Sequence, residues 1–542
     1  MASEKDSKRN NENIDLVSAG GRPISRRQFG GLLLGAGASL AGWGVFQTAY
    51  AATAATSSEP KKGGRVRIAL NSQGANDTFD GARALNPGDF IRCASIASIF
   101  SYLTRMDVDG KALPEVAESF ESSGNGKEWI FKIAKGIVYS DGSPLKMEDI
   151  VFSILRHQEK QVVSSAKQLV ANIKTVKVDG PQTIVVELLE PDADIPVTLS
   201  TSPFTIVKSG TYDFSKPIGT GPFVIKEFTP GVRTICVRND KYWKSGQPYI
   251  DEFEMFPIVD QVARANALLS GDVQMAIDIR GPSIAQLKAS ATAQPFITKA
   301  PRYTAIQGAV NMAPANNPNL GLALSYLIDR ERVLRTSLLG NGVIANDFPI
   351  ISGSPYCNTA LEQRKADPDK AKFYLAKSGV GKNRVPLHVS DASAFSVDIG
   401  QILQREATNI GLNLDLKREP ADSYWSAVVG KRPFFATTFN PRPTYNILLN
   451  LTWKTGAPWN FSHYSNPALD TLIDQARATV DEPKRIAIYH EIDAILHNSG
   501  ALILPAFINF VDGLSNRVKG LKPLPIAPMG GCFFTDQIWL DS

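Results

Sequence analysis

Aromatic and polar side chains that could bind a small molecule gather in one stretch of the chain, from Tyr424 to Trp459. This stretch holds three of the seven tryptophans and also carries Asn440, Arg442 and Lys454. Prolines interrupt it, which favours turns. Aromatic rings beside a few hydrogen-bonding groups are typical of a ligand pocket, although the same rings could instead fill a core. The residues that we expect to form an aromatic wall with polar anchors are Trp425, Phe439, Asn440, Arg442, Tyr445, Trp453 and Trp459.

Catalytic motifs are missing from the sequence. There is no G-x-S-x-G nucleophile elbow and no phosphate-binding P-loop. His490 and Glu491 begin an H-E-x-x-H pattern, but Ala494 stands where the second zinc ligand would be. His490 and His497 lie seven residues apart, and we expect them to be solvated or capping residues. We therefore expect no enzymatic reaction, no metal and no cofactor.

A possible calcium loop at Met106 to Gly110 is incomplete. It has two acidic residues two positions apart and a glycine, but the closing glutamate of a twelve-residue loop is absent. The segment predicts a plain turn.

Length and composition describe a globular protein of more than one domain. The chain has 542 residues, too many for one core, with 43% hydrophobic and 20% charged residues. Of the net charge of +5, residues 1–30 contribute +2 through six Lys or Arg and four Asp or Glu. The remaining +3 is dispersed, which argues against binding to nucleic acid.

Cys93, Cys236, Cys357 and Cys532 are far apart and form no metal-binding pair of the C-x-x-C type. One or two disulfides or buried free thiols are both compatible with this spacing.

The first 51 residues have the features of an export signal. Ser25-Arg26-Arg27-Gln28-Phe29 precedes an apolar run at residues 30–45, and Ala49-Tyr50-Ala51 is a small-x-small cleavage pattern. The arginine pair resembles a twin-arginine signal, although Gly30 stands where leucine is usual. A membrane anchor is the alternative, but the run is short and lacks stop-transfer charges. No cysteine near the cut site would carry a lipid.

Periodicity and turn residues predict an alternation of strands and helices after a linker at residues 52–62. The second half of the chain alternates most regularly, which predicts an α/β lobe. We expect strands at residues 63–70, 129–133, 183–190, 223–228, 234–237, 305–312, 386–389, 412–417, 434–438 and 501–510, and helices at 91–102, after Pro144, and at 263–272, 320–338, 368–378, 397–410, 467–480 and 483–498.

Five collinear stretches resemble one known family. Residues 217–251 read PIGTGPFVIKEFTPGVRTICVRNDKYWKSGQPYID, in which a glycine turn, a hairpin with Pro-Gly at its tip and an aromatic tail follow each other. The other four stretches are residues 113–154, 263–276, 322–333 and 463–476. Together they resemble the family 5 solute-binding proteins, which are the large receptors of ABC importers for peptides, nickel chelates, opines and related solutes.

The resemblance implies an α/β fold of the large periplasmic binding protein type. Such a fold has two lobes of mixed sheets flanked by helices and an extra subdomain inserted in the first lobe. The implied division is a signal peptide at 1–51, a linker at 52–62, lobe I at 63–107, the inserted subdomain at 108–216, lobe I again at 217–305, lobe II at 306–508 and a return to lobe I at 509–542.

The resemblance also implies a function and partners. We expect a periplasmic, monomeric receptor that closes on a peptide or peptide-like solute and delivers it to permease subunits in the inner membrane. A non-peptide solute such as an opine, a sugar conjugate or a metal chelate is the alternative. A periplasmic hydrolase or a chaperone is a remote one.

Peptide-binding relatives carry an aspartate near residues 438–444 that pairs with the α-ammonium group of the peptide. This chain has no carboxylate there. Arg442 instead offers a planar donor fork that suits a carboxylate or a phosphate. Our hypothesis is an anionic or zwitterionic solute whose acid group meets Arg442, and the alternative is a salt-bridge role for this residue.

In relatives, the loop at residues 71–82 and the strand at 305–311 face the cleft. The resemblance thus adds Phe79, Tyr303 and Gln307 as weaker contact candidates. His463 is a poor candidate for holding a nickel chelate.

Overall fold

The computed structural model describes residues 59–71, 74, 77–83, 96–123 and 125–541. The predicted signal peptide at residues 1–51, most of the linker and Cys93 lie outside the described residues. Residues 58–542 form one compact unit.

One mixed sheet extends through both lobes of this unit. Its strands are β1 (Arg65–Leu70), β8 (Phe223–Thr229), β9 (Arg233–Arg238), β10 (Glu252–Pro257), β11 (Met275–Ala276), β12 (Ala293–Gly308), β13 (Gly342–Ile344), β14 (Val385–Val389), β15 (Leu414–Arg418), β16 (Phe434–Phe439), β17 (Leu502–Ile503) and β18 (Ala506–Ser515). Within the described residues, the order is β15-β14-β16-β12-β18-β11-β1-β10-β9-β8, with β13 on β18 and β17 on β12. β1 is parallel to β10 and β11, and β14 is parallel to β15 and β16.

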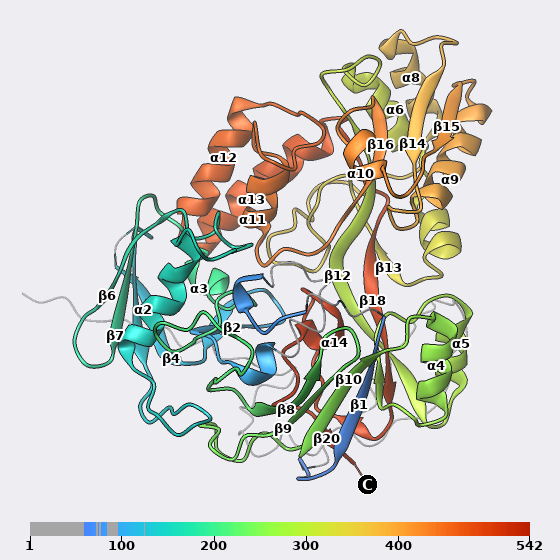
Figure 1. Ribbon diagram of the computed structural model, residues 1–542. Coiled ribbons are helices and arrows are strands. Elements are labelled where there is room, and N and C mark those ends of the chain that lie inside the picture. The colour runs from blue at the N-terminus through green and yellow to red at the C-terminus, as the bar shows by residue number, and fades with distance from the viewer. Residues whose placement is uncertain (1–58, 72–73, 75–76, 84–95, 124, 542) are drawn as a thin grey trace, which may run out of the picture. The chain divides into compact units, whose positions relative to one another are not determined.

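β12 and β18 connect the two lobes. The residues from Tyr303 to Gly308 pair with β16. Those from Ala293 to Thr298 pair with the end of β18, and this end of β18 also pairs with β11 on its other side. Figure 1 shows both strands running from the group around β1 and β10, lobe I, to the group around β14 and β16, lobe II. The division that we propose at 305/306 and 508/509 therefore falls inside these two strands.

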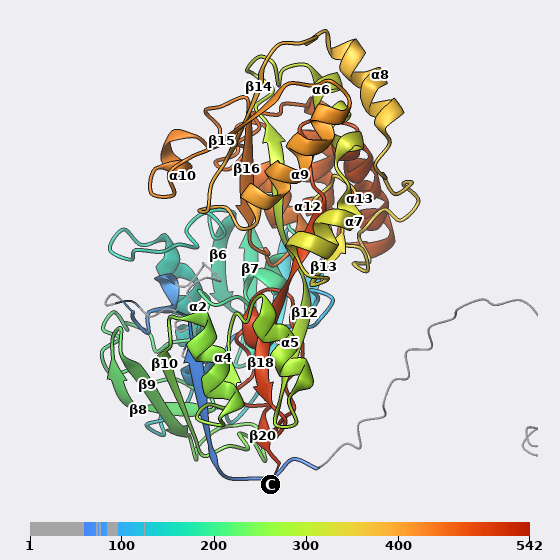
Figure 2. The same ribbon diagram turned by 90° about the vertical axis from the view of Figure 1, so that its right-hand side faces the viewer.

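Helices cover the sheet in both lobes. They are α2 (Met147–Leu155), α3 (Ile195–Thr198), α4 (Gln261–Leu269), α5 (Pro282–Ala289), α6 (Pro318–Leu327), α7 (Arg330–Arg332), α8 (Pro368–Ser378), α9 (Ser396–Asn409), α10 (Tyr424–Ala427), α11 (Tyr445–Thr452), α12 (Pro467–Ala478), α13 (Glu482–His497) and α14 (Pro528–Gly531). Leu268 of α4 and Leu287 of α5 share a core cluster with Ala69 of β1 and Val511 of β18. Figure 2 shows α4 and α5 in front of these strands. In lobe II, α6 and α9 pack on β14 and β16.

A smaller sheet lies within the predicted inserted subdomain. β4 (Ala117–Ser123), β5 (Glu128–Ile133), β7 (Thr183–Leu188) and β6 (Ile173–Val178) pair in this order. Ile150 and Ile154 of α2 close a core of their own with these strands. Two short ribbons, β2 (Thr104–Met106) with β3 (Ala112–Pro114) and β19 (Val518–Lys519) with β20 (Trp539–Leu540), complete the described strands. The predicted plain turn between β2 and β3 is confirmed, because Asp107 accepts from the backbone N–H groups of Asp109 and Lys111.

Several predicted elements differ from the structure. The strand expected at 501–510 is divided into β17 and β18, and β18 continues to Ser515. The strand expected at 305–312 begins much earlier, at Ala293. The helix expected at 320–338 ends at Leu327, because Asp329 caps a new helical segment. The stretch from Tyr424 to Trp459, which was expected to be turn-rich, contains α11. Thr444 caps the start of this helix, because its hydroxyl accepts a hydrogen bond from Ile447 N at 3.1 Å.

The hairpin and glycine turn predicted at residues 217–251 are confirmed, with β8 and β9 joined at Pro230 and Gly231. The glycines are required because the turn packs directly on the backbone at Ile99. A Cβ added to Gly219 would lie 2.0 Å from Ile99 O, and one added to Gly221 would lie 2.5 Å from Ile99 C. Gly221 N also donates to Ile99 O at 2.9 Å.

Cys236 and Cys357 are buried free thiols, and Cys532 is buried as well. Burial raises the pKa of the Cys357 thiol to about 11. These two free thiols are structural residues, since a buried thiol with a raised pKa is a poor nucleophile.

We predict that Gly219→Ala destabilises the protein by roughly 3 kcal/mol or more, because the methyl group clashes with backbone that cannot rotate away. Gly246→Ala is the control. Gly246 has a φ of +80° and open space around its Cβ position, so alanine there adds only backbone strain of about 1 kcal/mol. Urea unfolding of both variants measures the difference, and equal losses would contradict the role of the close approach.

Candidate functional site

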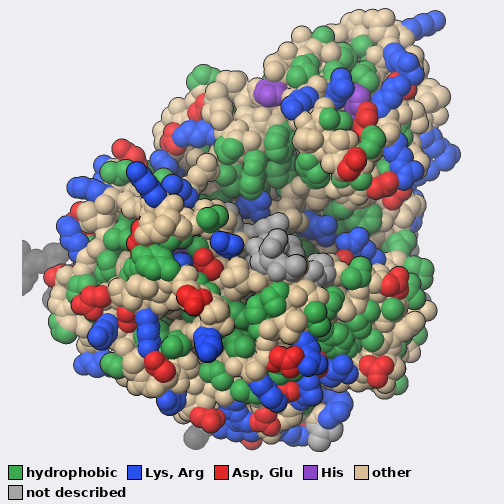
Figure 3. Space-filling model, in the orientation of Figure 1, with side chains coloured by type: hydrophobic (Ala, Val, Ile, Leu, Met, Phe, Trp, Pro, Cys, Tyr) green, Lys and Arg blue, Asp and Glu red, His purple; other side chains and the backbone are tan. Residues whose placement is uncertain are grey.

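Two cavities lie between the lobes. One, of about 240 Å³, is lined by Arg302 and is called the Arg302 pocket. The other, of about 570 Å³, is lined by Arg442 and is called the Arg442 cavity. Pro301 lines the Arg442 cavity and its neighbour Arg302 lines the Arg302 pocket, so the cavities lie on opposite faces of β12. Figure 3 shows a hollow between the lobes with Lys and Arg side chains at its edge.

The Arg302 pocket lies at the carboxyl end of β1. Asn71 follows β1 directly, and Ile277 to Arg280 follow its parallel neighbour β11; both segments line the pocket. Lobe II contributes Phe395 and Asn440 to the opposite wall. Ligands of α/β sheets bind at the carboxyl ends of parallel strands, and the pocket meets that rule while contacting both lobes.

Arg302 carries a positive charge without a carboxylate partner in the described part of the chain. Its Nε atom is buried and has no hydrogen-bond partner there. Burial lowers the pKa of Arg302, and the nearby charge of Arg280 lowers it further. Arg280 is itself paired with Asp278 at 2.7 Å. The pocket therefore holds one guanidinium that is desolvated and unpaired, and an anion would stabilise it.

Amide and aromatic groups complete this pocket. Asn509 Oδ1 is buried and makes no hydrogen bond to the described residues. Phe395 has a φ of 59°, an unusual backbone for a bulky residue. The preceding loop is held in place because the Thr304 hydroxyl donates to Ala394 O at 2.6 Å. Strain of this kind gathers at binding sites, where surrounding contacts over-determine it.

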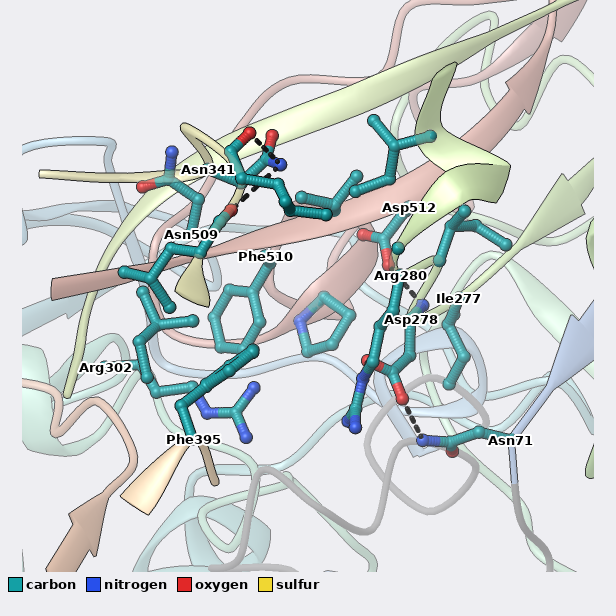
Figure 4. A pocket seen from close by; sticks show the side chains of 18 of the residues that line it. Asn71, Ile277, Asp278, Arg280, Arg302, Asn341, Phe395, Asn509, Phe510 and Asp512 are labelled. Atoms are coloured by element: carbon teal, nitrogen blue, oxygen red, sulfur yellow. Dashed lines mark hydrogen bonds and ion pairs between the residues drawn. The ribbon is translucent and has the colours of Figure 1, made fainter. Parts of the chain in front are cut away.

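The charges of the Arg302 pocket are arranged in two groups. Figure 4 shows Arg302 with Phe395 on one side, and Asp278, Arg280 and Asp512 on the other. Burial raises the pKa of Asp512 to about 7, and its oxygens accept from the backbone N–H groups of Asp278 and Met529. The arrangement suits a solute that carries an acid group at one end, with or without a cationic group at the other.

The Arg442 cavity lies between the inserted subdomain and lobe II, and ion pairs bridge it. Arg485 of α13 donates to the Asp194 carboxylate, which also accepts from the Thr444 hydroxyl. Lys111 and Glu482 form a second pair at 2.8 Å. The Asp194–Arg485 pair is buried, so breaking it would leave an uncompensated charge. These contacts fix the inserted subdomain against lobe II.

Tyr445, at the start of α11, connects this cavity to the core of lobe II. Its hydroxyl donates to Asp493 Oδ1 at 2.7 Å, and Asp493 Oδ2 accepts from Asn358 N at 3.0 Å. Burial raises the pKa of Asp493 to about 7, although both hydrogen bonds oppose the rise.

The structure separates the residues expected to share one aromatic wall. Arg442 and Tyr445 line the Arg442 cavity, whereas Asn440 lines the Arg302 pocket. Trp459 lies under Arg442, whose guanidinium carbon is 4.7 Å from the ring centroid. Trp453 is 1% exposed in the core of lobe II, and Trp425 is 44% exposed on α10 and lines neither cavity. The expectation of one continuous wall does not match these positions, because α11 turns Trp453 inward.

The weaker candidates are core residues. Phe79 packs on Phe228 with ring centroids 4.5 Å apart. Tyr303 and Phe439 are paired across β12 and β16, with centroids 5.4 Å apart. Gln307 is buried and accepts from the Thr437 hydroxyl at 3.1 Å. None of these three side chains lines either cavity, and neither does Phe439, which was expected in the aromatic wall.

Sequence reasoning missed Arg302, Asn509 and Phe395. Arg302 was next to a chosen residue, Tyr303, and strand alternation would have placed it on the other face of β12. Asn509 stands in the segment expected only to return the chain to lobe I. Phe395 carries no signal in the sequence, since its position depends on a left-handed backbone.

His463 and His497 make hydrogen bonds to backbone carbonyls, whereas Nε2 of His490 is buried without a partner among the described residues, so His490 is not the solvated residue expected. His463 Nε2 lies 2.8 Å from Gly430 O, and His497 Nδ1 lies 2.7 Å from Asn346 O. No group of three or more His, Cys, Asp or Glu side chains within the described residues could hold a metal ion. Of the helices in that part of the chain, none has the length and apolarity needed to cross a bilayer.

Solved periplasmic binding proteins are similar to this chain in fold. The binding protein AgaA of Agrobacterium tumefaciens R10, in complex with agropinic acid, superposes with a TM-score of 0.72 at 21% identity over 88% of this chain and 99% of that chain. DppA of Helicobacter pylori, in complex with the peptide STSA, gives 0.73 at 19% identity over 89% and 99%. The fold is thus the two-lobed α/β fold of periplasmic binding proteins, with an extra small sheet.

The sequence comparisons agree with the fold. The model of the bacterial extracellular solute-binding proteins, family 5, matches residues 111–455. The nickel-binding periplasmic protein of Escherichia coli K12 is 23% identical over 466 residues, covering 80% of this chain and 87% of its own length. The glutathione-binding protein GsiB of Pectobacterium atrosepticum is 23% identical over 473 residues, covering 83% and 90%.

The chain belongs to the family 5 bacterial extracellular solute-binding proteins. It is a solute-binding protein, which binds its solute without transforming it. Within the described residues, the Arg302 pocket and the Arg442 cavity are the candidate solute sites between its lobes.

We predict that Asp493 makes the protein less stable as pH rises from about 4 to 7. The folded-state pKa of about 7 lies above the ordinary value of 3.8 for an aspartate. Between these two pH values the folded state binds a proton that the unfolded state has lost, so stability falls as pH rises through this range. In Asp493→Asn, the amide can donate to Tyr445 and accept from Asn358 N, so the packing is kept without the charge. The variant should gain on the order of 2–4 kcal/mol relative to wild type between pH 5 and pH 8.

Thermal unfolding of both proteins across this pH range measures the change in their difference. A difference that does not vary with pH would contradict the assignment. Asp369→Asn, on the exposed face of α8, is the control and should leave the pH profile unchanged.

Proposed function

We propose that this receptor captures a peptide or peptide-like solute with an acid group in the Arg302 pocket and delivers it to the permease. The observation that carries this proposal is Arg302, a guanidinium between the lobes that has no carboxylate partner among the described residues. A bidentate contact with a solute carboxylate would satisfy it, while Asn440 and Asn509 supply further hydrogen-bonding groups.

A zwitterionic solute fits the two sides of the pocket. Its acid group would face Arg302, and its ammonium group would face Asp278, which is only half-buried and already shares its charge with Arg280. The segment from Thr438 to Thr444 offers no carboxylate for an ammonium group, so the peptide N-terminus would be recognised differently from the way the family resemblance suggests.

An acidic opine is the second candidate. The similar protein AgaA is in complex with agropinic acid. In the Arg302 pocket Arg302 has no carboxylate partner among the described residues, whereas Asp278 is paired with Arg280 and Asp512 accepts two backbone N–H groups. A solute with an acid group and no free ammonium would suit these charges. Sugar conjugates with an acid group remain within the same class, whereas a nickel chelate lacks histidine support in the described part of the cleft.

Closure of the lobes would bury the solute. Arg302 and Asn509 lie on the strands that join the lobes, Asn440 and Phe395 lie on lobe II, and Asn71 lies on lobe I. A solute that contacts both lobes binds the closed arrangement more tightly, so binding shifts the equilibrium toward closure. Arg442 and Tyr445 remain proposed contacts, now for the other cavity, and Trp459 supports the guanidinium of Arg442.

We predict that Arg302→Ala weakens solute binding by at least about 30-fold, because a charge-assisted contact worth about 2 kcal/mol or more is lost. Arg302→Lys keeps the charge but not the planar fork, and should recover part of the affinity. The solute is first identified by native mass spectrometry of the protein purified from its own host, and affinity is then measured by calorimetry.

Arg384→Ala is the matched control, because Arg384 is exposed and paired with Asp415 at 2.8 Å on lobe II. It should leave affinity unchanged. Unaltered affinity in Arg302→Ala, with a solute bound, would refute the pocket as the solute site. Equal affinity for the solute and its carboxamide would refute the role of the acid group.

The proposed location is the periplasm, reached with a cleaved twin-arginine signal peptide of residues 1–51. Replacing both Arg26 and Arg27 by Lys keeps the charge but removes the guanidinium groups. We predict that this change blocks export of the full-length chain, with precursor accumulating inside the cell. Cell fractionation and mass determination of the N-terminus measure export and cleavage. Normal export of the variant would contradict the twin-arginine route and leave a general secretion signal.

A further inference from the structure

The Arg442 cavity has the features of a binding site that is separate from the Arg302 pocket. Its volume of about 570 Å³ lies within the usual range for small-molecule sites, roughly 300–1,000 Å³. It is also on the other face of β12, so a solute held by Arg302 does not fill it. A ligand of the Arg442 cavity is therefore a different molecule from the solute that Arg302 holds.

Arg442 is a second guanidinium without a carboxylate partner in the described residues. Its one hydrogen bond there runs from Nη1 to Pro441 O at 3.1 Å. Burial lowers the pKa of Arg442. Trp459 supports the flat face of the guanidinium at 4.7 Å, which leaves the edge with its N–H groups to contact a ligand. This is how arginine is held when it recognises a planar anion.

Most other charges of this cavity are paired. Asp194 is paired with Arg485 and Glu482 with Lys111, whereas the exposed Asp109 at the rim has no ion pair among the described residues. Lys299, at the rim, has no ion pair in the described part of the chain. The surplus in the cavity is therefore positive, and it excludes a simple cation as the occupant.

The remaining walls are apolar or aromatic. Tyr356, Tyr445 and Tyr489 line the cavity together with Ile350, Leu448 and Ile526. Proline rings from both lobes also contribute, including Pro196 of the inserted subdomain and Pro349 of lobe II. Walls of this kind favour a ligand with an apolar body over a hydrated inorganic ion.

We propose that the Arg442 cavity is a second binding site, which takes a small organic carboxylate with an apolar or aromatic body. The carboxylate contacts Arg442, and the body lies against the tyrosines and prolines. Because the walls come from the inserted subdomain and from lobe II, an occupant adds to the contacts that Asp194–Arg485 and Lys111–Glu482 make between them. Occupancy therefore stabilises the arrangement of the lobes without using the Arg302 pocket.

The test uses the mature protein and a matched pair of probes, 4-phenylbutyrate and its uncharged amide. Calorimetry should detect binding of the acid, and the protein should bind the amide at least about 10-fold more weakly. Trp459 lies directly under Arg442, so its fluorescence should change when the acid binds. Trp459→Phe should lose that part of the signal while calorimetry still reports binding.

Two glutamine variants separate this site from the pocket of the proposed function. Arg442→Gln should weaken the acid at least about 10-fold, and Arg302→Gln should leave it unchanged. Arg442→Lys keeps the protein charge and should retain intermediate affinity, so a loss through misfolding of Arg442→Gln is recognised. Arg384→Gln is the neutral control.

Three results would overturn the second site: no binding of the acid, equal binding of acid and amide, or equal loss in Arg302→Gln and Arg442→Gln. The last result would mean that one site spans both arginines, and it would leave the proposed function standing. Conversely, if only Arg442→Gln loses binding of the natural solute, the transported solute binds in the Arg442 cavity. That result would refute the proposal that the Arg302 pocket is the solute site.

Discussion

The antiparallel pairing of β12 with β18 is the constraint on which both cavities depend. These strands belong to both lobes. One end of β12 pairs with β16 of lobe II, and the other end pairs with the part of β18 that also pairs with β11 of lobe I. Side chains of such a shared strand emerge between the lobes on both faces. Pro301 and Arg302 are adjacent in sequence, yet they line different cavities for this reason.

Paired and unpaired charges have different roles around this crossing. The buried Asp194–Arg485 pair joins two parts of the chain, and Asp347 likewise accepts from both Arg330 and Arg364 inside lobe II. Such groups are satisfied and fix structure. Arg302 and Arg442 lack carboxylate partners in the described residues, although burial disfavours their charge. Desolvating a charge without a partner costs several kcal/mol, so these two positions are where a ligand anion would gain most.

Local patterns in the sequence predicted the elements well and the site only in part. α8 was expected at its observed bounds because a proline begins it and Gly379 ends it in the left-handed region. The hairpin of β8 and β9 followed from alternation and Pro-Gly. The turn-rich expectation for the segment around Tyr445 failed, because the Thr444 cap and the burial of Leu448 and Leu449 outweigh the flanking prolines.

The site could not be predicted completely from the sequence. Its composition depends on the face of the strand, helix or loop on which each side chain lies. Trp425 and Trp453 were chosen for their ring chemistry, but one is exposed on a short helix and the other fills the core of lobe II. No alternation extends through the loop from Asn440 to Thr444, so nothing in the sequence separates Asn440 from Arg442. Only the course of the loop after β16 sends these residues into different cavities.

That separation bears on the chemistry of the solute. If one loop supplies an amide to the Arg302 pocket and a guanidinium to the Arg442 cavity, a movement of the loop changes both at once. Thr444 at its end bonds to Asp194 of the inserted subdomain, while Phe439 at its start is held against Tyr303. The loop is thus anchored at its start within the sheet of lobe II and at its end to the inserted subdomain. A ligand that shifts this loop in one cavity would therefore change the position of the groups that the loop supplies to the other.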